Sequence, residues 1–124
     1  MDPDTKINDS DTQVSFFKTT VKRFVEKRGW KKYHTPKNLI QAMDIELAEL
    51  SELFLFVDYD MKDILNNEEL YKNIKEEVAD IFIYLISFVN TLNIDLSESF
   101  VEKMEKNRKK YDIKEFNDGR YYKK

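Results

Sequence analysis

Apolar residues recur three and four positions apart along most of the chain, which is the spacing of one helix face. This pattern predicts a first helix over residues 14–32, and it weakens at Gly29. A second helix begins with Thr35 as N-cap and Pro36 at its first position, and it runs to about residue 60. Its apolar face consists of Leu39, Ile40, Met43, Leu47, Leu50, Phe54 and Val57.

Two further helices follow a polar loop around Asn66 and Asn67. The third covers residues 68–90, and its second half is apolar on nearly every side, which predicts burial. The fourth starts at Asp95, where Asp95 and Glu98 have capping-box spacing, and its pattern ends near residue 112. Glycine and proline are scarce and no strand-type alternation appears. We therefore expect an all-α chain folded as a four-helix bundle.

The length of 124 residues fits one domain with a single core. Such a core is small, and the most apolar helix then needs a second subunit to cover it, so we expect a homo-oligomer, either a dimer or a tetramer. We divide the chain into a disordered acidic segment at residues 1–13, a helical domain at 14–112 and a basic tail at 113–124.

The chain contains no cysteine, which excludes disulfides and thiolate metal sites and suits a reducing cytoplasm. The first residues lack a signal-peptide pattern, and the longest apolar run is too short to span a bilayer. We expect a cytoplasmic protein whose partners include neither a membrane nor a nucleic-acid polymer.

Two pairs of acidic residues stand out, because each pair is spaced i, i+3 and so projects from one helix face. Glu46 and Glu49 lie in the second predicted helix, and Glu77 and Asp80 directly precede the most apolar run of the third. Two unit charges about 4 Å apart repel by roughly 4 kcal/mol at an effective dielectric near 20. A four-acid cluster facing a helical interior therefore needs protonation or a cation. Its all-oxygen ligands suit Mg²⁺, with Mn²⁺ as an alternative.

A less specific interpretation applies to the first pair, since a Glu-x-x-Glu pair on an amphipathic helix is usually solvated. The second pair favours a site, because aspartate is a poor helix former and Asp80 adjoins a core-type run. A di-iron bundle would need Glu-x-x-His on two helices. The chain has one histidine, His34, and cannot supply that set.

Three segments resemble the all-α nucleoside triphosphate pyrophosphatases, and within them the MazG-like group that includes the dCTP pyrophosphatases. The first is IELAELSELF at 45–54 with EEVADIFIYL at 76–85, in which Glu-x-x-Glu and Glu-x-x-Asp enclose 27 residues. The others are FVEKRGWKKYHTPKNL at 24–39 and KMEKNRKKY at 103–111. The resemblance implies a MazG-like fold that hydrolyses a nucleoside triphosphate between its α and β phosphates with magnesium.

The resemblance also implies residue roles. Glu46, Glu49, Glu77 and Asp80 would bind metal, and Glu46 or Glu49 would also activate the attacking water. The implied substrate-binding residues are Trp30, His34, Asn38, Phe56, Tyr84, Lys103, Asn107, Arg108 and Tyr111. Lys103, Asn107 and Tyr111 share a helix face and would contact phosphates. Trp30 and His34 would contact the base. Phe56 stands where dCTP-type members place a tryptophan, so the ring surface is kept and the indole donor is lost.

The substrate implied is a deoxynucleoside triphosphate, either dCTP or a modified relative, with clearance of the nucleotide pool as its purpose. Two alternatives stay open at this point. One is a related pyrophosphohydrolase acting on dUTP or phosphoribosyl-ATP. The other is a non-enzymatic helical module that dimerises through the third helix and carries its acids for solubility.

Overall fold

A computed structural model describes residues 7–124, and its regular structure there is entirely helical. The elements within this range are α1 Val14–Lys27, the 3-10 helix η1 Lys31–Tyr33, α2 Pro36–Glu52, α3 Met61–Asn66, α4 Glu68–Thr91 and α5 Leu96–Lys110. They form two compact units that divide after Asn93. The all-α prediction is confirmed, but the described residues contain five α-helices, so the prediction of four is wrong. Residues 1–6 of the predicted acidic segment lie outside the described residues.

The first helix is shorter than predicted because Gly29 ends it. Gly29 adopts a positive φ of 66°, its N–H donates to the Glu26 carbonyl at 3.1 Å, and the Trp30 N–H donates to the Val25 carbonyl at 3.1 Å. This pair of bonds satisfies two carbonyls at the helix end with glycine in the left-handed conformation. The short helix η1 then leads through His34 to Thr35, whose hydroxyl caps α2 by accepting from Asn38 N–H at 3.3 Å.

The second helix ends at Glu52 instead of continuing to about residue 60. After Leu50 the backbone bonds become tight turns, such as Phe54 N–H to the Ser51 carbonyl at 3.0 Å, and Phe56 then adopts a φ of +60°. The Asp60 carboxylate accepts from Asp63 N–H at 2.8 Å and starts α3, a helix that the pattern did not predict. Phe54 is therefore used in a turn, where its ring packs against Tyr59 at 5.8 Å.

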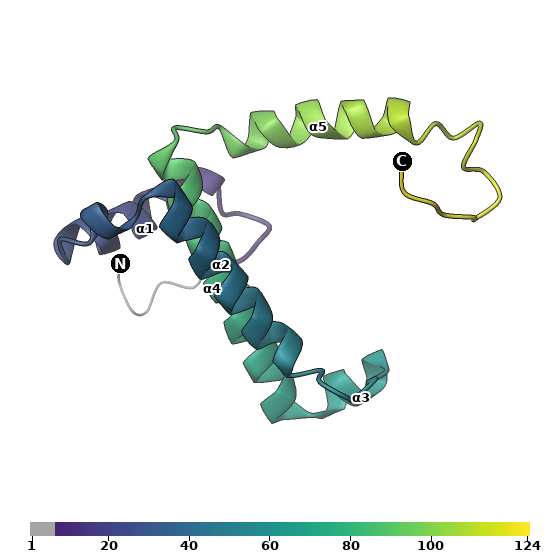
Figure 1. Cartoon of the computed structure of the whole chain (residues 1–124), viewed down its shortest axis with the longest axis horizontal. Coiled ribbons are helices and arrows are strands. Elements are labelled where there is room, and N and C mark those ends of the chain that lie inside the picture. The colour runs from purple at the N-terminus through teal and green to yellow at the C-terminus, as the bar shows by residue number, and fades with distance from the viewer. Residues whose placement is uncertain (1–6) are drawn as a thin grey trace. The chain divides into compact units, whose positions relative to one another are not determined.

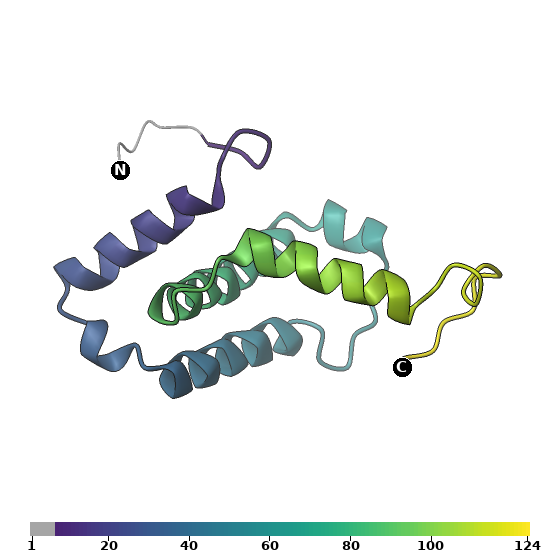
Figure 2. The same ribbon diagram turned by 90° about the horizontal axis from the view of Figure 1, so that it is seen from above.

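Helices α2 and α4 lie antiparallel and side by side, as Figures 1 and 2 show for the first unit. The buried core comprises Val25, Leu39, Leu70, Ile86 and Val89. Burying each of the fully enclosed side chains Leu39 and Ile86 stabilises the fold by about 1.5–3 kcal/mol. Helix α1 packs on α4 through an edge-to-face contact between Phe17 and Phe82 at 5.1 Å. The Asn90 amide fixes the same pair of helices by donating to the Lys18 carbonyl at 3.0 Å.

The third predicted helix is confirmed as α4, which Asn67 caps by accepting from Leu70 N–H at 3.0 Å. Its expected burial is found only in part, because Val78 and Ile83 remain 50% and 45% exposed. The start of α5 also agrees with the prediction, since the Asp95 carboxylate accepts from Glu98 N–H at 3.0 Å.

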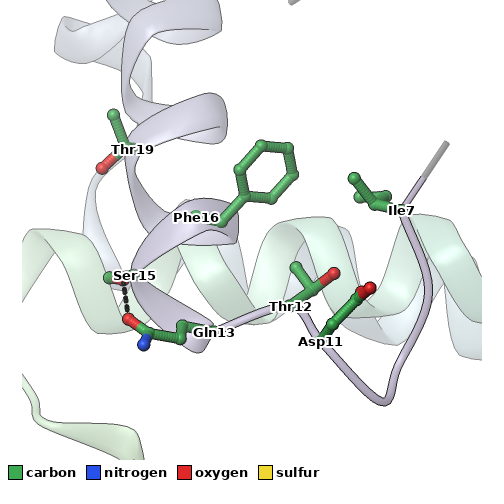
Figure 3. Close-up of a pocket in the computed structure, with 7 residues that line it drawn as sticks. All are labelled: Ile7, Asp11, Thr12, Gln13, Ser15, Phe16 and Thr19. Carbon is green, nitrogen blue, oxygen red and sulfur yellow. Dashed lines mark hydrogen bonds between the residues drawn. The ribbon is translucent and has the colours of Figure 1, made fainter. Parts of the chain in front are cut away.

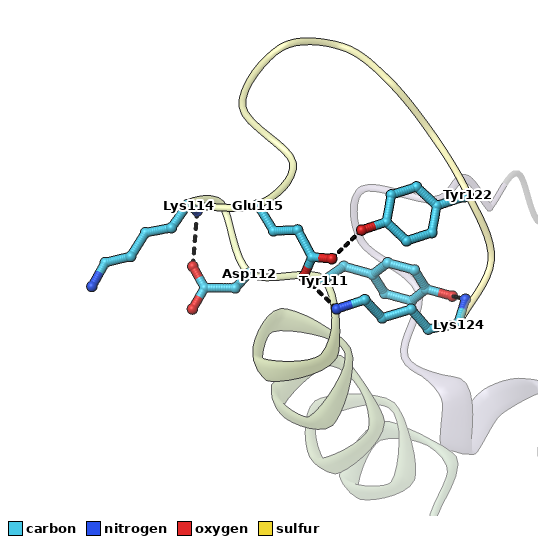
Figure 4. Close-up of polar contacts among 6 residues, drawn as sticks. All are labelled: Tyr111, Asp112, Lys114, Glu115, Tyr122 and Lys124. Carbon is cyan, nitrogen blue, oxygen red and sulfur yellow. Dashed lines mark hydrogen bonds and ion pairs between the residues drawn. The ribbon is translucent and has the colours of Figure 1, made fainter.

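The segment after α5 returns to the end of that helix (Figure 4). The Lys124 backbone N–H donates to the Tyr111 hydroxyl at 3.0 Å, and Glu115 accepts from both the Tyr122 hydroxyl and the Lys124 ammonium. The Phe116 ring lies between Tyr111 and Tyr122, at 5.3 and 4.8 Å. The predicted basic tail is therefore a folded turn stabilised by aromatic and ionic contacts.

Within the described residues, no single helix is both long enough and apolar enough to cross a membrane, and α4 and α5 pass that test of length and composition only as a pair.

Replacing Gly29 with alanine should lower the free energy of unfolding by about 1 kcal/mol, the cost of the left-handed conformation for a residue with a Cβ. A Cβ at Gly29 would meet no atom within 4 Å, so new steric contacts should add nothing. Urea denaturation would measure the difference. Gly29→Asn is the control and should lose less, because asparagine tolerates this conformation better. Equal losses for the two variants would contradict the assignment of the cost to the backbone.

Candidate metal and substrate site

The antiparallel packing of α2 on α4 brings three of the four predicted metal ligands together. Glu46 projects from α2, and Glu77 and Asp80 project from α4. One carboxylate oxygen from each lies within 4.8 Å of the others. At that separation two full charges repel by about 3.5 kcal/mol at an effective dielectric near 20. The three acids therefore cannot all be ionised here without a large electrostatic cost.

The environment of these acids makes the charged form still less favourable. Glu46 Oε2 and Glu77 Oε2 are both buried, and among the described residues neither has a hydrogen-bond partner. Burial, together with Glu49, Glu77 and Asp80 nearby, raises the pKa of Glu46 from 4.5 to about 7. Burial also raises the pKa of Glu77, with Glu49 and Asp80 acting in the same direction.

Buried, unpartnered carboxylate oxygens are what a hard cation would satisfy. Native proteins rarely leave such atoms without a partner. The donors are all oxygen, and they come from two helices that are held rigidly against each other, so the residues present fit a Mg²⁺ or Mn²⁺ ion.

Glu49 is the fourth predicted ligand, and it lies at the edge of this group. It is exposed, and it does not belong to the three residues whose oxygens converge. It is nevertheless close enough to contribute to the raised pKa of both Glu46 and Glu77. Its assignment as a ligand or as a base stays a prediction.

His34 lies near Tyr84, which follows Asp80 by one turn of α4. Their ring centroids are 6.5 Å apart, with an angle of 36° between the ring planes. His34 Nδ1 lies 2.7 Å from the hydroxyl of Ser87. Burial lowers the pKa of His34 below its usual 6.5, so the imidazole is neutral at pH 7. The sequence prediction named His34 and Tyr84 separately as substrate-binding residues, and it did not identify Ser87.

The other predicted base-site residues in this unit have more exposed positions. Trp30 packs edge-on against Phe24 at 5.9 Å, and the Arg28 guanidinium covers the Phe24 ring at 3.6 Å. Asn38 uses its side-chain N–H to bond the Tyr33 carbonyl at 3.0 Å. Phe56 is 98% exposed, on the left-handed backbone described above. No contact links Phe56 to the acids in residues 7–124, and its assignment to the substrate stays a prediction.

The four remaining predicted residues belong to the second unit, Ile94–Lys124. Lys103 is exposed on α5, and Arg108 forms an exposed ion pair with Glu105 at 3.4 Å. Asn107 lies one turn before Tyr111, whose N–H donates to the Asn107 carbonyl at 2.8 Å. The Tyr111 hydroxyl accepts the bond from Lys124.

Sequence reasoning missed two features of the first unit. One is Ser87, and its signal was a single hydroxyl inside the apolar run that follows Tyr84. The other is an open pocket of about 560 Å³ beside the start of α1, shown in Figure 3. It is lined by Ile7, Asp11, Thr12, Gln13, Ser15, Phe16 and Thr19. Its lining has no cluster of acids or bases that would indicate chemistry.

Comparisons with known proteins identify a family and several similar proteins. The family described as the MazG-like family matches residues 42–123. The chain is 31% identical over 91 residues to dCTP pyrophosphatase 1 of Rattus norvegicus, covering 73% of this chain and 54% of that protein. It is 32% identical over 89 residues to dCTP pyrophosphatase 1 of Homo sapiens, covering 71% and 52%. The chain thus spans about half the length of these curated relatives.

A solved structure is similar over almost its whole length. The crystal structure of a pyrophosphatase from Archaeoglobus fulgidus superposes with a TM-score of 0.73 at 36% identity, covering 86% of this chain and 99% of that one.

The stability of the metal-free protein should fall as pH rises from 4.5 towards about 7. The folded chain keeps the Glu46 proton over this range while the unfolded chain loses it, so the folded state binds more protons and loses stability with rising pH. Thermal unfolding in EDTA would measure this. Glu46→Gln should be the more stable protein at pH 7 and similar to the parent at pH 4.5. Parallel pH profiles for the two proteins would contradict the raised pKa.

Proposed function

Because this chain belongs to the MazG-like family, we propose that it is a nucleoside triphosphate pyrophosphohydrolase. It cleaves between the α and β phosphates and releases a monophosphate and pyrophosphate. The observation that carries the proposal is the convergence of Glu46, Glu77 and Asp80 with buried, unpartnered oxygens. Phosphoryl transfer depends mainly on positioning and on neutralising charge, and such a group supplies the anchor for both. The similarity to dCTP pyrophosphatases and to a pyrophosphatase structure supports the same activity.

The cofactor we propose is Mg²⁺, with Mn²⁺ as a substitute, held by Glu46, Glu77 and Asp80 and assisted by Glu49. When bound, the ion would neutralise charge on the phosphates and orient the triphosphate. The protein's part is to keep the three carboxylates at a fixed spacing on two packed helices. In this proposal the cation is the partner of the buried oxygens Glu46 Oε2 and Glu77 Oε2.

Glu49 is the residue we assign as general base. It is exposed, so a water molecule can reach it, and it acts electrostatically on Glu46 and Glu77. In this assignment the Glu49 carboxylate accepts a proton from the water as the water oxygen attacks phosphorus. The bond between that phosphorus and the oxygen bridging the α and β phosphates breaks, which releases the monophosphate and pyrophosphate. Glu46, with its buried oxygen, is the better ligand and the poorer base.

The orientation of the substrate follows from one stripe of α4. Asp80, Tyr84 and Ser87 are spaced i, i+4 and i+7, so they share a helix face. Seven residues of helix rise about 10 Å, which separates the acids from the position of His34 beside Ser87. A charged end and a neutral aromatic end along one face match a nucleotide, whose phosphates are charged and whose base is flat.

The substrate we propose is dCTP or a modified deoxynucleoside triphosphate, in a pathway that clears unwanted nucleotides. His34 and Tyr84 contact the base in this proposal, and Trp30, Asn38 and Phe56 are further candidates. Lys103, Asn107, Arg108 and Tyr111 are proposed as phosphate ligands from the motif alone. A cytoplasmic location remains a prediction from the lack of cysteine.

Self-association is the remaining part of the proposal. In the first unit, apolar side chains stay exposed on the helices that carry the acids: Ile45 and Leu47 on α2, and Val78 and Ile83 on α4. Their exposed fractions lie between 45% and 60%. Exposed apolar surface of this kind indicates a contact with another protein, and a second copy of this chain satisfies that requirement.

The activity is tested by incubating the pure protein and Mg²⁺ with canonical and modified nucleoside triphosphates and phosphoribosyl-ATP. We expect pyrophosphate from a deoxycytidine-type substrate and loss of activity in EDTA. Pyrophosphate and orthophosphate are scored separately. Release of orthophosphate alone would contradict the position of cleavage, and no product from any substrate would refute the enzyme. Preference for dUTP or phosphoribosyl-ATP would select the alternative substrate.

Substitutions at the acids should separate the chemistry from the fold. Glu49→Gln is expected to lower kcat by about 100-fold or more, the scale of a lost general base, with unchanged circular dichroism. Asp80→Asn should raise the Mg²⁺ concentration needed for half-maximal rate. Glu52→Gln is a matched control, since Glu52 ends the same helix and lies outside the converging acids. Full activity in Glu49→Gln would refute its assignment as base.

The oligomer is tested by light scattering during size-exclusion chromatography. The protein should elute with a mass of two or more chains, and Ile83→Glu should reduce that mass because it places a charge on the proposed contact. Lys72→Glu controls for added negative charge on the same helix. A single-chain mass for the unaltered protein would exclude the homo-oligomer.

A further inference from the structure

We propose that Ser87 is a positioning residue for the nucleobase, because its hydroxyl donates to His34 Nδ1 and holds the imidazole as the tautomer protonated on Nε2. This inference rests on the proposed function, in which His34 contacts the base. It adds a residue that none of the sequence motifs contained. It also states which kind of base edge the site accepts.

The first observation is the burial of Ser87. It is 4% exposed, and it is the one buried polar side chain among the described residues. It lies on α4 directly after the fully enclosed Ile86. A hydroxyl removed from water without a hydrogen-bond partner destabilises the fold. Such a residue persists in a small core only where it has a partner, and here that partner is 53 positions away in the sequence.

The second observation is the identity of the partner. The Ser87 hydroxyl lies 2.7 Å from His34 Nδ1, and in residues 7–124 this is the contact that the hydroxyl makes. A buried hydroxyl proton is directed at an acceptor, and in this assignment that acceptor is His34 Nδ1. Nδ1 must then carry a lone pair, which a neutral imidazole provides on one nitrogen. The lowered pKa of His34 keeps the ring in that neutral form at pH 7.

The third observation is that α4 holds His34 at two points. Ser87 contacts its ring, and the Thr91 hydroxyl lies 3.4 Å from its backbone carbonyl and 2.9 Å from the Ser87 carbonyl. The Tyr84 ring lies alongside the imidazole. The ring is thus fixed by a bond at one nitrogen and has the Tyr84 ring beside it, with the centroids 6.5 Å apart. Restricting its rotation lowers the entropy cost of using Nε2 in binding.

The consequence is a rule of recognition. With Nδ1 occupied as an acceptor, Nε2–H is a donor, and a donor binds an acceptor on the substrate. The site therefore favours a base edge that presents a carbonyl oxygen or an unprotonated ring nitrogen at this position. An edge that presents an amino group there would face a donor with a donor and would be rejected, because both groups would lose their hydrogen bonds to water.

The direct test is the protonation of the His34 ring nitrogens by nitrogen-15 NMR of the full chain. His34 is the sole histidine, so its signals need no assignment. In the unaltered protein we expect a proton on Nε2 and none on Nδ1. Ser87→Ala should produce a mixture of tautomers, and Thr91→Val, which removes a neighbouring hydroxyl that contacts only carbonyls, should leave the tautomer unchanged. A proton on Nδ1 in the unaltered protein would overturn the inference without any variant having to fold.

The second test uses the triphosphate found in the substrate panel. Ser87→Ala should raise KM about 10-fold with a smaller change in kcat, since a lost hydrogen bond to the base weakens substrate and transition state alike. Ser87→Thr, which keeps the hydroxyl, should recover most of the loss. An unchanged KM in Ser87→Ala would overturn the inference.

The two measurements also separate this inference from the proposed function. Hydrolysis by a protein with a proton on Nδ1 would refute the assignment of Ser87 alone. An Nε2–H tautomer in a protein that hydrolyses no triphosphate would refute the base contact and the enzyme together.

Discussion

Packing of α2 against α4 forces like charges into one partly buried space, and the properties of the candidate site follow from that conflict. Leu39 on α2 and Ile86 and Val89 on α4 are buried, and burial of such side chains stabilises the packed helices. The same register sets Glu46 opposite Glu77 and Asp80. The acids cannot separate without breaking the apolar contact, so the repulsion is relieved by protonation or by a cation. The raised pKa of Glu46 and the proposed affinity for a divalent ion are two results of one constraint.

Helix α4 carries both ends of the proposed substrate site because its polar residues share one stripe. Glu77 and Asp80 supply charge, Tyr84 supplies a ring, and Ser87 supplies a hydroxyl that His34 requires. The acidic end holds protons more tightly and attracts cations, while the other end keeps an imidazole uncharged. In the proposed function, separation of these environments along one helix lets the fold hold phosphates at one end and contact a base at the other.

Local signals explain which parts of the fold were predictable. Thr35 with Pro36, and Asp95 with Glu98, mark helix starts that depend on bonds within one turn, and both are found where they were expected. The ends were less predictable. Helix α1 ends at the turn around Gly29, several residues before the predicted boundary, and α2 ends before Phe54 although the apolar spacing continues. Apolar spacing cannot distinguish a ring that packs in a helix from one that packs in a turn, as Phe54 does on Tyr59.

The sequence by itself determined the helical class, the pairing of acids on two helix faces and the resemblance that names their chemistry. These depend on periodicity and spacing, which a chain carries before it folds. Only the tertiary structure decided which acids converge, that two of their oxygens are buried without partners, and that Ser87 meets His34. Those facts depend on the register between helices far apart in the chain. That register is set by the summed burial of many side chains, and no single motif contains it.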